Sequence, residues 1–187
     1  TYLGVTDNGP LAGGKFSTFQ GGLAVPLMMR WPEAIPPGTL YERPVSLMDV
    51  FATIEAATRP SPDSALRGSR QWDGVDLVPY VDGTQAGDPH ETLFFRSFYN
   101  HAVRSGPWKL IVQDRGSPGA TDGAIELLFN LDSDPHERDN VAEAHPEIVK
   151  RLRAELERWE HGLAPPLWPP VMHFWMEVWG VRYWFAI

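Results

Sequence analysis

The sequence predicts an α/β protein that combines the end of a large mixed or parallel sheet sandwich domain with a small α+β subdomain. For the first part, a short β-prone run opens the chain and leads into a polar, glycine-rich loop, and a continuous apolar run follows at 23–30. For the second part, hydrophobicity alternates with a period of two from Thr92, and an amphipathic helical pattern follows at 146–161. We therefore expect the large-sheet domain to occupy residues 1–74 and the subdomain residues 75–187.

The composition limits the possible functions. A chain of 187 residues can bury a core, and its net charge of -8 argues against a nucleic-acid-binding surface. It contains no cysteine, which excludes disulfides, thiolate metal sites and a thiol nucleophile within these residues. No uninterrupted apolar run reaches the length of a membrane span. We expect neither a nucleic-acid partner nor a membrane-spanning helix.

Two elements are expected in the first domain. The run at 23–30 fits a short strand that is covered on both faces, because it lacks polar alternation. Ser46 can cap a helix, and Asp49 stands three residues later as the acid of a capping box, which explains Asp49 without a catalytic role. Met48, Phe51 and Ile54 or Glu55 follow at helical spacing, and the apolar face of this helix is expected to pack on the sheet.

The subdomain is expected to hold a four-stranded antiparallel sheet and one helix. The strands are predicted at 93–98, 101–104, 108–113 and 126–131. Because short turns connect most of them, neighbouring strands should pair antiparallel. The helix at 146–161 has one apolar stripe and should cover one face of the sheet. A last strand is expected at 182–187.

Several other residues of the subdomain are assigned structural roles. Arg104 and Lys109 alternate with apolar neighbours on their strands, so both are expected to face solvent. His101 is expected to be structural, although it could enter a substrate cleft. The tryptophan-rich tail at 163–187 is expected to pack on its own domain, although such a cluster could also bind a sugar ring or a membrane interface.

The opening loop contains three polar residues that suit a metal and anion site. Asp7 and Asn8 offer oxygen donors of the kind that Ca²⁺ or Mg²⁺ takes, and Lys15 is a compact cation suited to an oxyanion. In an open α/β sheet, ligands bind beyond the carboxyl ends of strands, where this loop is expected. A simple turn is the alternative, since Asn8 with Gly9 is a strong turn signal that needs no metal.

Several strings, in order, resemble the sulfatase family. Its pattern has a strand ending in S/T-D-N-G, then G-x-K, then E-G-G-x-R-V-P leading to W-P; this chain has TDNGP, GGK and QGGLAVPLMMRWP. VSLMDVFATI, WDGVDLVPYVDG, HAVRSGPWKLI and ELLFNLDSDPHERDNVA follow in the family's order. The resemblance covers most of the chain. It implies the carboxyl-terminal portion of an arylsulfatase-like enzyme of the alkaline phosphatase superfamily, so we expect an amino-terminal part upstream of Thr1.

The resemblance also implies roles for individual residues. Asp7 and Asn8 match the family's late pair of calcium ligands, which join two aspartates from a part of the chain not present here. Lys15 matches the lysine that contacts the sulfate group. The family nucleophile is a formylglycine made from Cys or Ser in a C/S-x-P-x-R motif, which these residues lack. Gln20 replaces the usual Glu and Ala24 a common Arg, and both are expected to tune the support of the loop.

The resemblance implies part of a calcium-dependent sulfatase that hydrolyses sulfate esters of an aryl or carbohydrate alcohol. Its partners would be a sulfate-ester small molecule or a sulfated carbohydrate, together with the missing amino-terminal part of the same enzyme. The chain alone is expected to be inactive. One alternative is a phosphonate monoester or phosphodiester hydrolase of the same superfamily. The other is a non-catalytic binding protein, because the formylglycine motif is absent from this chain.

Overall fold

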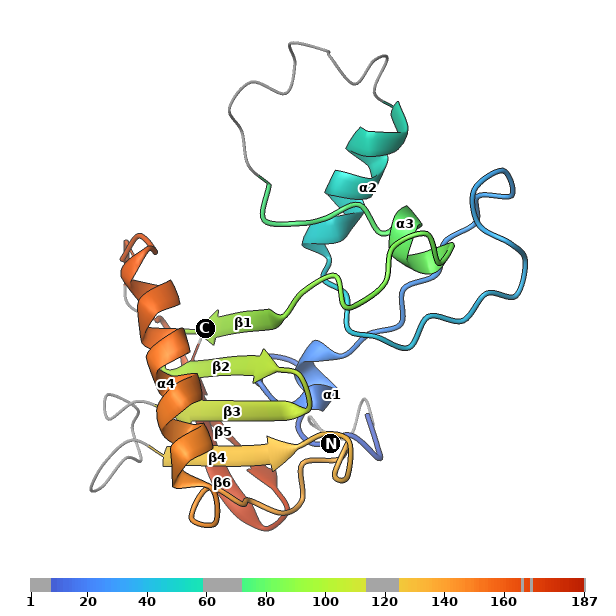
Figure 1. The fold of residues 1–187 in the computed structure, drawn as a ribbon. Helices are drawn as coiled ribbons and strands as arrows, with labels where there is room; N and C mark the ends of the chain where they lie inside the picture. Colours follow the sequence, from blue (N-terminus) through green and yellow to red (C-terminus); the bar gives the residue numbers. More distant parts are fainter. Residues whose placement is uncertain (1–7, 59–71, 114–124, 166, 169, 187) are drawn as a thin grey trace. The chain divides into compact units, whose positions relative to one another are not determined.

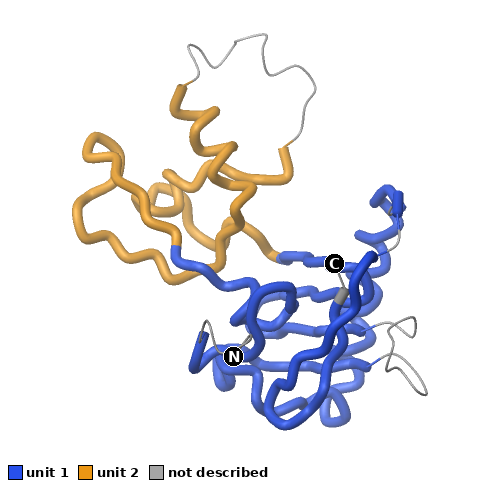
Figure 2. The backbone as a smooth tube through the Cα atoms, turned by 180° about the vertical axis from the view of Figure 1, so that it is seen from behind, with its two compact units in different colours: residues 1–26, 92–187 blue, residues 27–91 orange. Residues whose placement is uncertain are grey.

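The chain folds into two compact units, which are described separately. The computed structural model describes residues 8–58, 72–113, 125–165, 167–168 and 170–186. One unit joins Thr1–Pro26 to Thr92–Ile187, and the other is Leu27–Glu91 (Figure 2). The expected boundary after residue 74 concerns the domains of the intact protein and stays a prediction.

A four-stranded antiparallel sheet organises the first unit (Figure 1). Its strands are β1 (Thr92–Ser97), β2 (Asn100–Ser105), β3 (Trp108–Gln113) and β4 (Ile125–Asn130). They lie in chain order, and each pairs antiparallel with its neighbour. The predicted sheet is therefore confirmed, with only small shifts at the strand ends.

One face of this sheet is covered by α4 (Pro146–His161), as Figure 1 shows. Pro146 occupies the first helical turn, where its missing N–H is not needed. Leu152 and Leu156 are buried from the helix side, and Leu110 and Leu128 meet them from the sheet. The helix has the predicted bounds and packs by its predicted apolar stripe.

The opposite face of the sheet is covered by a hairpin and by the opening loop. The hairpin consists of β5 (His173–Val178) and β6 (Val181–Ala186), which pair antiparallel. The shared core on this face contains Ala12, Phe19, Ala102, Ile111, Leu127, Phe129, Leu131, Met176, Val178 and Phe185. Thus the opening loop packs directly on the sheet that begins about 80 residues later in the chain.

The hairpin confirms the predicted last strand, but it also contains a strand that was not predicted. The last strand was predicted, but β5 was not, because Phe174 and Trp175 are apolar on opposite faces and mask the alternation. Phe185 packs into the core, as expected for a tail that returns to its own domain. Trp175, however, leaves 48% of its surface exposed, and Arg182 stacks over its ring at 4.1 Å.

The second unit contains α2 (Met48–Thr58) and α3 (Val78–Val81). The capping role of Asp49 is confirmed, since its carboxylate accepts from the Ser46 backbone N–H at 2.7 Å. The same fully buried carboxylate accepts from the Val75 N–H at 3.0 Å and lies 2.8 Å from His90 Nε2. Asp49 therefore ties the segments at Val75 and His90 to the start of α2.

Two expectations for the first domain are wrong in this structure. Residues 24–30 are exposed and form no strand, and α1 (Gln20–Leu23) occupies the start of the expected run. The apolar face of α2 is also exposed: Met48, Phe51 and Ile54 each leave half or more of their surface accessible. Both differences have one physical reason. A strand needs a hydrogen-bonded neighbour, and no strand occurs among the described residues before Thr92. The described part of this domain therefore has no sheet that 24–30 could join or that α2 could cover.

Candidate functional site

The candidate site is the opening loop, of which the structure describes Asn8 onward. The Asn8 carboxamide donates through Nδ2 to the Gly21 carbonyl at 2.7 Å, which closes the loop on itself. The same nitrogen would lie 3.6 Å from a Cβ built on Gly14, so Asn8 sits beside the residue that precedes Lys15. Asp7, the other predicted ligand, lies outside the described residues. The structure therefore brings together Asn8 and the segment that carries Lys15.

Lys15 is exposed on this loop. Its ammonium lies 5.0 Å from the centre of the Phe16 ring, an arrangement that holds the side chain without enclosing it. Phe16 has a positive φ of 74° and packs edge-on against Phe174 of the hairpin, with 5.6 Å between ring centres. A cation is thus presented to solvent from a backbone that the hairpin supports.

The glycines of α1 allow this loop to close tightly. A Cβ on Gly21 would stand 2.5 Å from the Ala12 carbonyl oxygen, and one on Gly22 only 2.2 Å from that of Ser17. The Gly21 N–H donates to Ala12 O at 2.7 Å. α1 lies directly against the loop backbone on both sides of Lys15, and only glycine, which has no side chain, permits this close approach.

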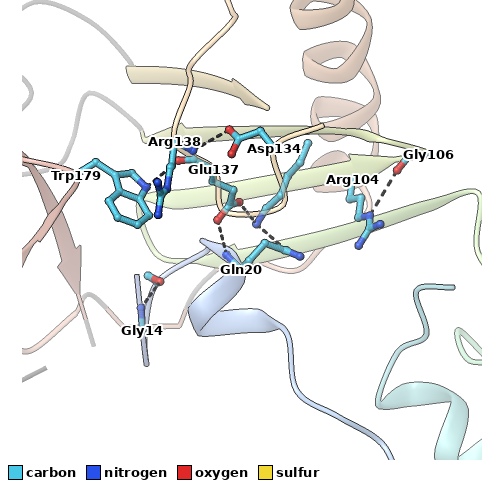
Figure 3. Close-up of polar contacts among 10 residues, drawn as sticks. Gly14, Gln20, Arg104, Gly106, Asp134, Glu137, Arg138 and Trp179 are labelled. Carbon is cyan, nitrogen blue, oxygen red and sulfur yellow. Dashed lines mark hydrogen bonds and ion pairs between the residues drawn. The ribbon is translucent and has the colours of Figure 1, made fainter. Parts of the chain in front are cut away.

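Behind the loop lies a buried polar cluster that the sequence analysis did not identify (Figure 3). Lys109 Nζ donates to Glu137 Oε1 at 2.6 Å and to Gln20 Oε1 at 3.1 Å. The other carboxylate oxygen of Glu137 accepts from the Gln20 backbone N–H at 2.6 Å. We call these three residues the Gln20–Lys109–Glu137 cluster. It joins α1 to β3 and to the segment after β4.

The prediction that Lys109 faces solvent is wrong, since its side chain is 0% exposed. In the sheet register Lys109 stands opposite Phe129, which belongs to the core under the hairpin and the opening loop. Alternation correctly separates the two faces of a strand, but here both faces are covered. The sequence did contain a sign that Lys109 is buried, because Lys109 lies on the same face of the strand as the apolar Ile111. Arg104, opposite Lys109 on β2, is half-buried.

Burial dominates the electrostatics of the cluster. It lowers the pKa of the Lys109 ammonium from its usual 10.5 to about 8, although the Glu137 carboxylate acts in the opposite direction. Burial likewise raises the pKa of the Glu137 carboxyl, against the effect of Lys109 and of the Gln20 N–H. Both shifts favour the neutral forms. Burial of the charged pair therefore carries a desolvation cost that an apolar pair of similar volume would not have.

Further contacts attach Glu137 to the hairpin. Its backbone carbonyl accepts from the Trp179 indole N–H at 2.9 Å, and Trp179 lies in the turn between β5 and β6 (Figure 3). The Arg138 guanidinium stacks on the same indole at 4.9 Å, while its backbone N–H donates to Asp134 at 2.7 Å. Glu137 itself has a φ of 56°, a strained value for a non-glycine residue. Several contacts thus hold this backbone in place.

Of the two predicted calcium ligands, the described residues contain Asn8. It donates through its side-chain nitrogen, so its amide oxygen takes no part in that hydrogen bond. Within the described ranges, no three His, Cys, Asp or Glu side chains gather closely enough to hold an ion. His101 is buried and pairs with Glu160 of α4, which fits the expected structural role. No helix in the described part of the chain is long and apolar enough to cross a bilayer.

Comparisons with known proteins agree with the strings in the sequence. The chain matches no protein-family model. It is 32% identical over 210 residues to steryl-sulfatase from Mus musculus, covering 92% of this chain and 32% of that protein. It is 35% identical over 171 residues to arylsulfatase A from Bos taurus, covering 78% and 32%. The solved structure of Ps i-CgsB in complex with k-i-k-neocarrahexaose matches 87% of this chain and 34% of that chain, at 26% identity and a TM-score of 0.64.

The chain therefore spans about one third of the length of the curated relatives that it matches. Sequence similarity and structural similarity extend over most of its own residues. Both kinds of comparison lead to proteins named as sulfatases or to structures with the same fold. The chain belongs to the sulfatase family.

Proposed function

We propose that the intact protein hydrolyses sulfate esters and that this chain supplies one wall of the active site. The proposal assigns Asp7 and Asn8 as calcium ligands and Lys15 as the cation that contacts the sulfate group. The observation that carries it is the loop geometry, in which Asn8 lies beside Gly14 and the neighbouring Lys15 is exposed. Membership of the sulfatase family connects that geometry with the hydrolysis of sulfate esters.

Lys15 would bind and orient the sulfate group. A lysine ammonium has three N–H donors on a flexible stem, so it can follow an oxyanion as charge develops on the sulfate oxygens. Its exposure leaves it accessible to a substrate. The cation–π contact with Phe16 favours a limited range of side-chain positions over the loop.

Asp7 and Asn8 would hold the calcium ion through a carboxylate and an amide oxygen. When bound, calcium neutralises negative charge on the sulfate oxygens. Calcium takes six to eight oxygen ligands, so two residues do not complete the site. We propose that the other ligands and the nucleophile come from the rest of the intact protein, because no C/S-x-P-x-R motif occurs in these residues.

The exposed apolar surface of the second unit supports this division of the site. Leu27, Met28, Phe51 and Ile54 remain accessible in a family member that spans about a third of its relatives. Exposed apolar groups on this scale favour a covering partner. We propose that the amino-terminal part of the same enzyme packs here.

The substrate class is a sulfate ester of an aryl or carbohydrate alcohol. A carbohydrate is supported by the solved neighbour, which binds k-i-k-neocarrahexaose. The test is hydrolysis by the intact protein of p-nitrophenyl sulfate, a sulfated oligosaccharide and matched phosphate and phosphonate esters, with and without a calcium chelator. We expect calcium-dependent release of sulfate. Faster turnover of the phosphate or phosphonate ester would instead favour a phosphodiester or phosphonate monoester hydrolase of the superfamily. If none of the esters is turned over, a non-catalytic binding protein is favoured.

A further inference from the structure

We propose that Gln20, Lys109 and Glu137 are positioning residues that fix the Asn8–Lys15 loop against the sheet. The loop-fixing role rests on geometry alone, and its effect on sulfate-ester hydrolysis rests on the proposed function. None of the three residues carries an assigned reaction role. All three lie behind the loop, and two of them are far from it in the sequence.

Lys109 and Glu137 connect the sheet side of the unit to α1 through Gln20. Glu137 accepts from the Gln20 backbone N–H, and Lys109 donates to the Gln20 side chain, so both parts of Gln20 are held (Figure 3). Lys109 and Glu137 are each fully buried. A residue with two such contacts cannot shift without breaking a charge-assisted hydrogen bond in a dry interior.

α1 in turn contacts the loop through its two glycines. Gly21 and Gly22 directly follow Gln20 and lie against the backbone of Ala12 and Ser17, with no room for a Cβ. Asn8 also donates to the Gly21 carbonyl. A displacement of Gln20 would therefore carry both glycines with it. The loop on either side of Lys15 would have to move as well.

A charged cluster at this place carries a desolvation cost that apolar residues would not have. An apolar pair would also be unable to accept from the Gln20 N–H. A buried, hydrogen-bonded pair instead fixes one geometry, at the place where the loop meets the sheet. Gln20 adds an amide oxygen without adding a second negative charge.

The test compares two double variants of the intact protein. Lys109→Met with Glu137→Gln removes both charges and keeps an acceptor for the Gln20 N–H, whereas Lys109→Met with Glu137→Leu also removes the acceptor. We measure hydrogen exchange of amides 8–22 and the kinetics of sulfate-ester hydrolysis. The second variant should exchange at least tenfold faster in 8–22 and lose at least tenfold in kcat with KM little changed. The first should recover part of both losses.

The matched control removes an ion pair elsewhere in the same unit. Arg153→Met with Glu126→Gln breaks a 3.1 Å pair between α4 and β4 and should change neither measurement. Wild-type exchange in 8–22 for both cluster variants would overturn the proposal, as would an equal rise in exchange throughout the protein. Two results together would separate the two proposals: a localised rise in exchange in the cluster variants, and no sulfatase activity in the wild-type protein. They would refute the proposed function and leave the positioning role standing.

A pH profile gives a second readout that a purely structural role would not move. The charged groups around Lys109 are Glu137 and Arg104, and Asp134 acts on Glu137. Gln20→Glu would place a second carboxylate at the position now 3.1 Å from the ammonium. Loss of the Lys109 proton weakens its charge-assisted hydrogen bonds to the cluster, so kcat and protection of 8–22 should fall as pH rises through the pKa of Lys109. The added carboxylate raises that pKa, so both declines should move to higher pH. Identical alkaline profiles in wild type and Gln20→Glu would overturn the proposal.

Discussion

Lys109 Nζ lies 2.6 Å from Glu137 Oε1, and neither side chain is exposed to solvent. This ion pair crosses from β3 to the segment after β4, on the sheet face that the opening loop and the hairpin cover. A buried charge is tolerated only while its partner is present. The relationship leads to predictions for stability, for pH and for the loop.

The single variants Lys109→Met and Glu137→Gln should each destabilise the protein by about 3–5 kcal/mol, because each leaves a buried charge without its partner. The double variant should be close to wild type or more stable, since both charges are removed together. Urea unfolding of the four proteins forms a double-mutant cycle that measures this coupling. Additive losses in the double variant would show that the pair does not act as a unit.

The free energy of unfolding should rise with pH between about 8 and 10.5. Folded Lys109 has a pKa of about 8, below its usual 10.5, so the unfolded state binds more protons in this window. The slope is then positive, up to about 1.4 kcal/mol per pH unit. Lys109→Met with Glu137→Gln should lack this contribution. Parallel curves for wild type and the double variant, from urea unfolding at several pH values, would contradict it.

These residues also show what a sequence pattern can and cannot predict. β3 and α4 were predicted with their correct bounds because alternation and helical periodicity are local properties. The burial of Lys109 was missed because it depends on Glu137 and on the loop, both distant in the sequence. Residues 24–30 form no strand for a related reason. Pairing depends on a neighbour that no local pattern supplies.

Asn8 and Asp49 illustrate the same limit at the polar sites. Capping by Asp49 was predictable because the box spans only three residues. The Asn8 contact with Gly21 spans 13 positions, so no spacing rule anticipates it. Lys15 was identified through its family-like string, and Glu137 was not singled out although it lies within another such string. Local chemistry identified candidate residues, whereas their support became visible only in the fold.

Gly22→Ala should disturb the loop more than a comparable change elsewhere. The new Cβ would stand 2.2 Å from Ser17 O and 2.5 Å from Gly14 O, and neither backbone atom can rotate away. We expect a loss of about 1–3 kcal/mol in unfolding free energy, together with lower activity in the intact protein. Gly162→Ala is the control, because its nearest contact is 3.4 Å and its φ of -83° suits alanine. Equal effects in the two variants would argue against tight closure of the loop.

The 187-residue chain on its own should neither hydrolyse p-nitrophenyl sulfate nor bind calcium tightly. It offers two of the ligands that the proposed site needs and no formylglycine motif. Isothermal titration with calcium should give a millimolar or weaker dissociation constant for the isolated chain, whereas the intact protein should bind calcium more tightly. Sub-millimolar affinity in the isolated chain would mean that its own residues complete a calcium site.

Lys15→Ala in the intact protein should lower turnover of a sulfate ester by roughly two to three orders of magnitude, the usual effect of removing one charge-stabilising donor. Because Lys15 is exposed and lies outside the core, thermal unfolding should change little. Lys150→Ala, an exposed lysine on α4, is the matched control and should leave both properties unchanged. Lys15→Arg should recover only part of the rate, since a planar guanidinium does not reproduce a compact ammonium. An unchanged rate in Lys15→Ala would remove this residue from the site while leaving the Gln20–Lys109–Glu137 cluster to be judged by its own exchange measurements.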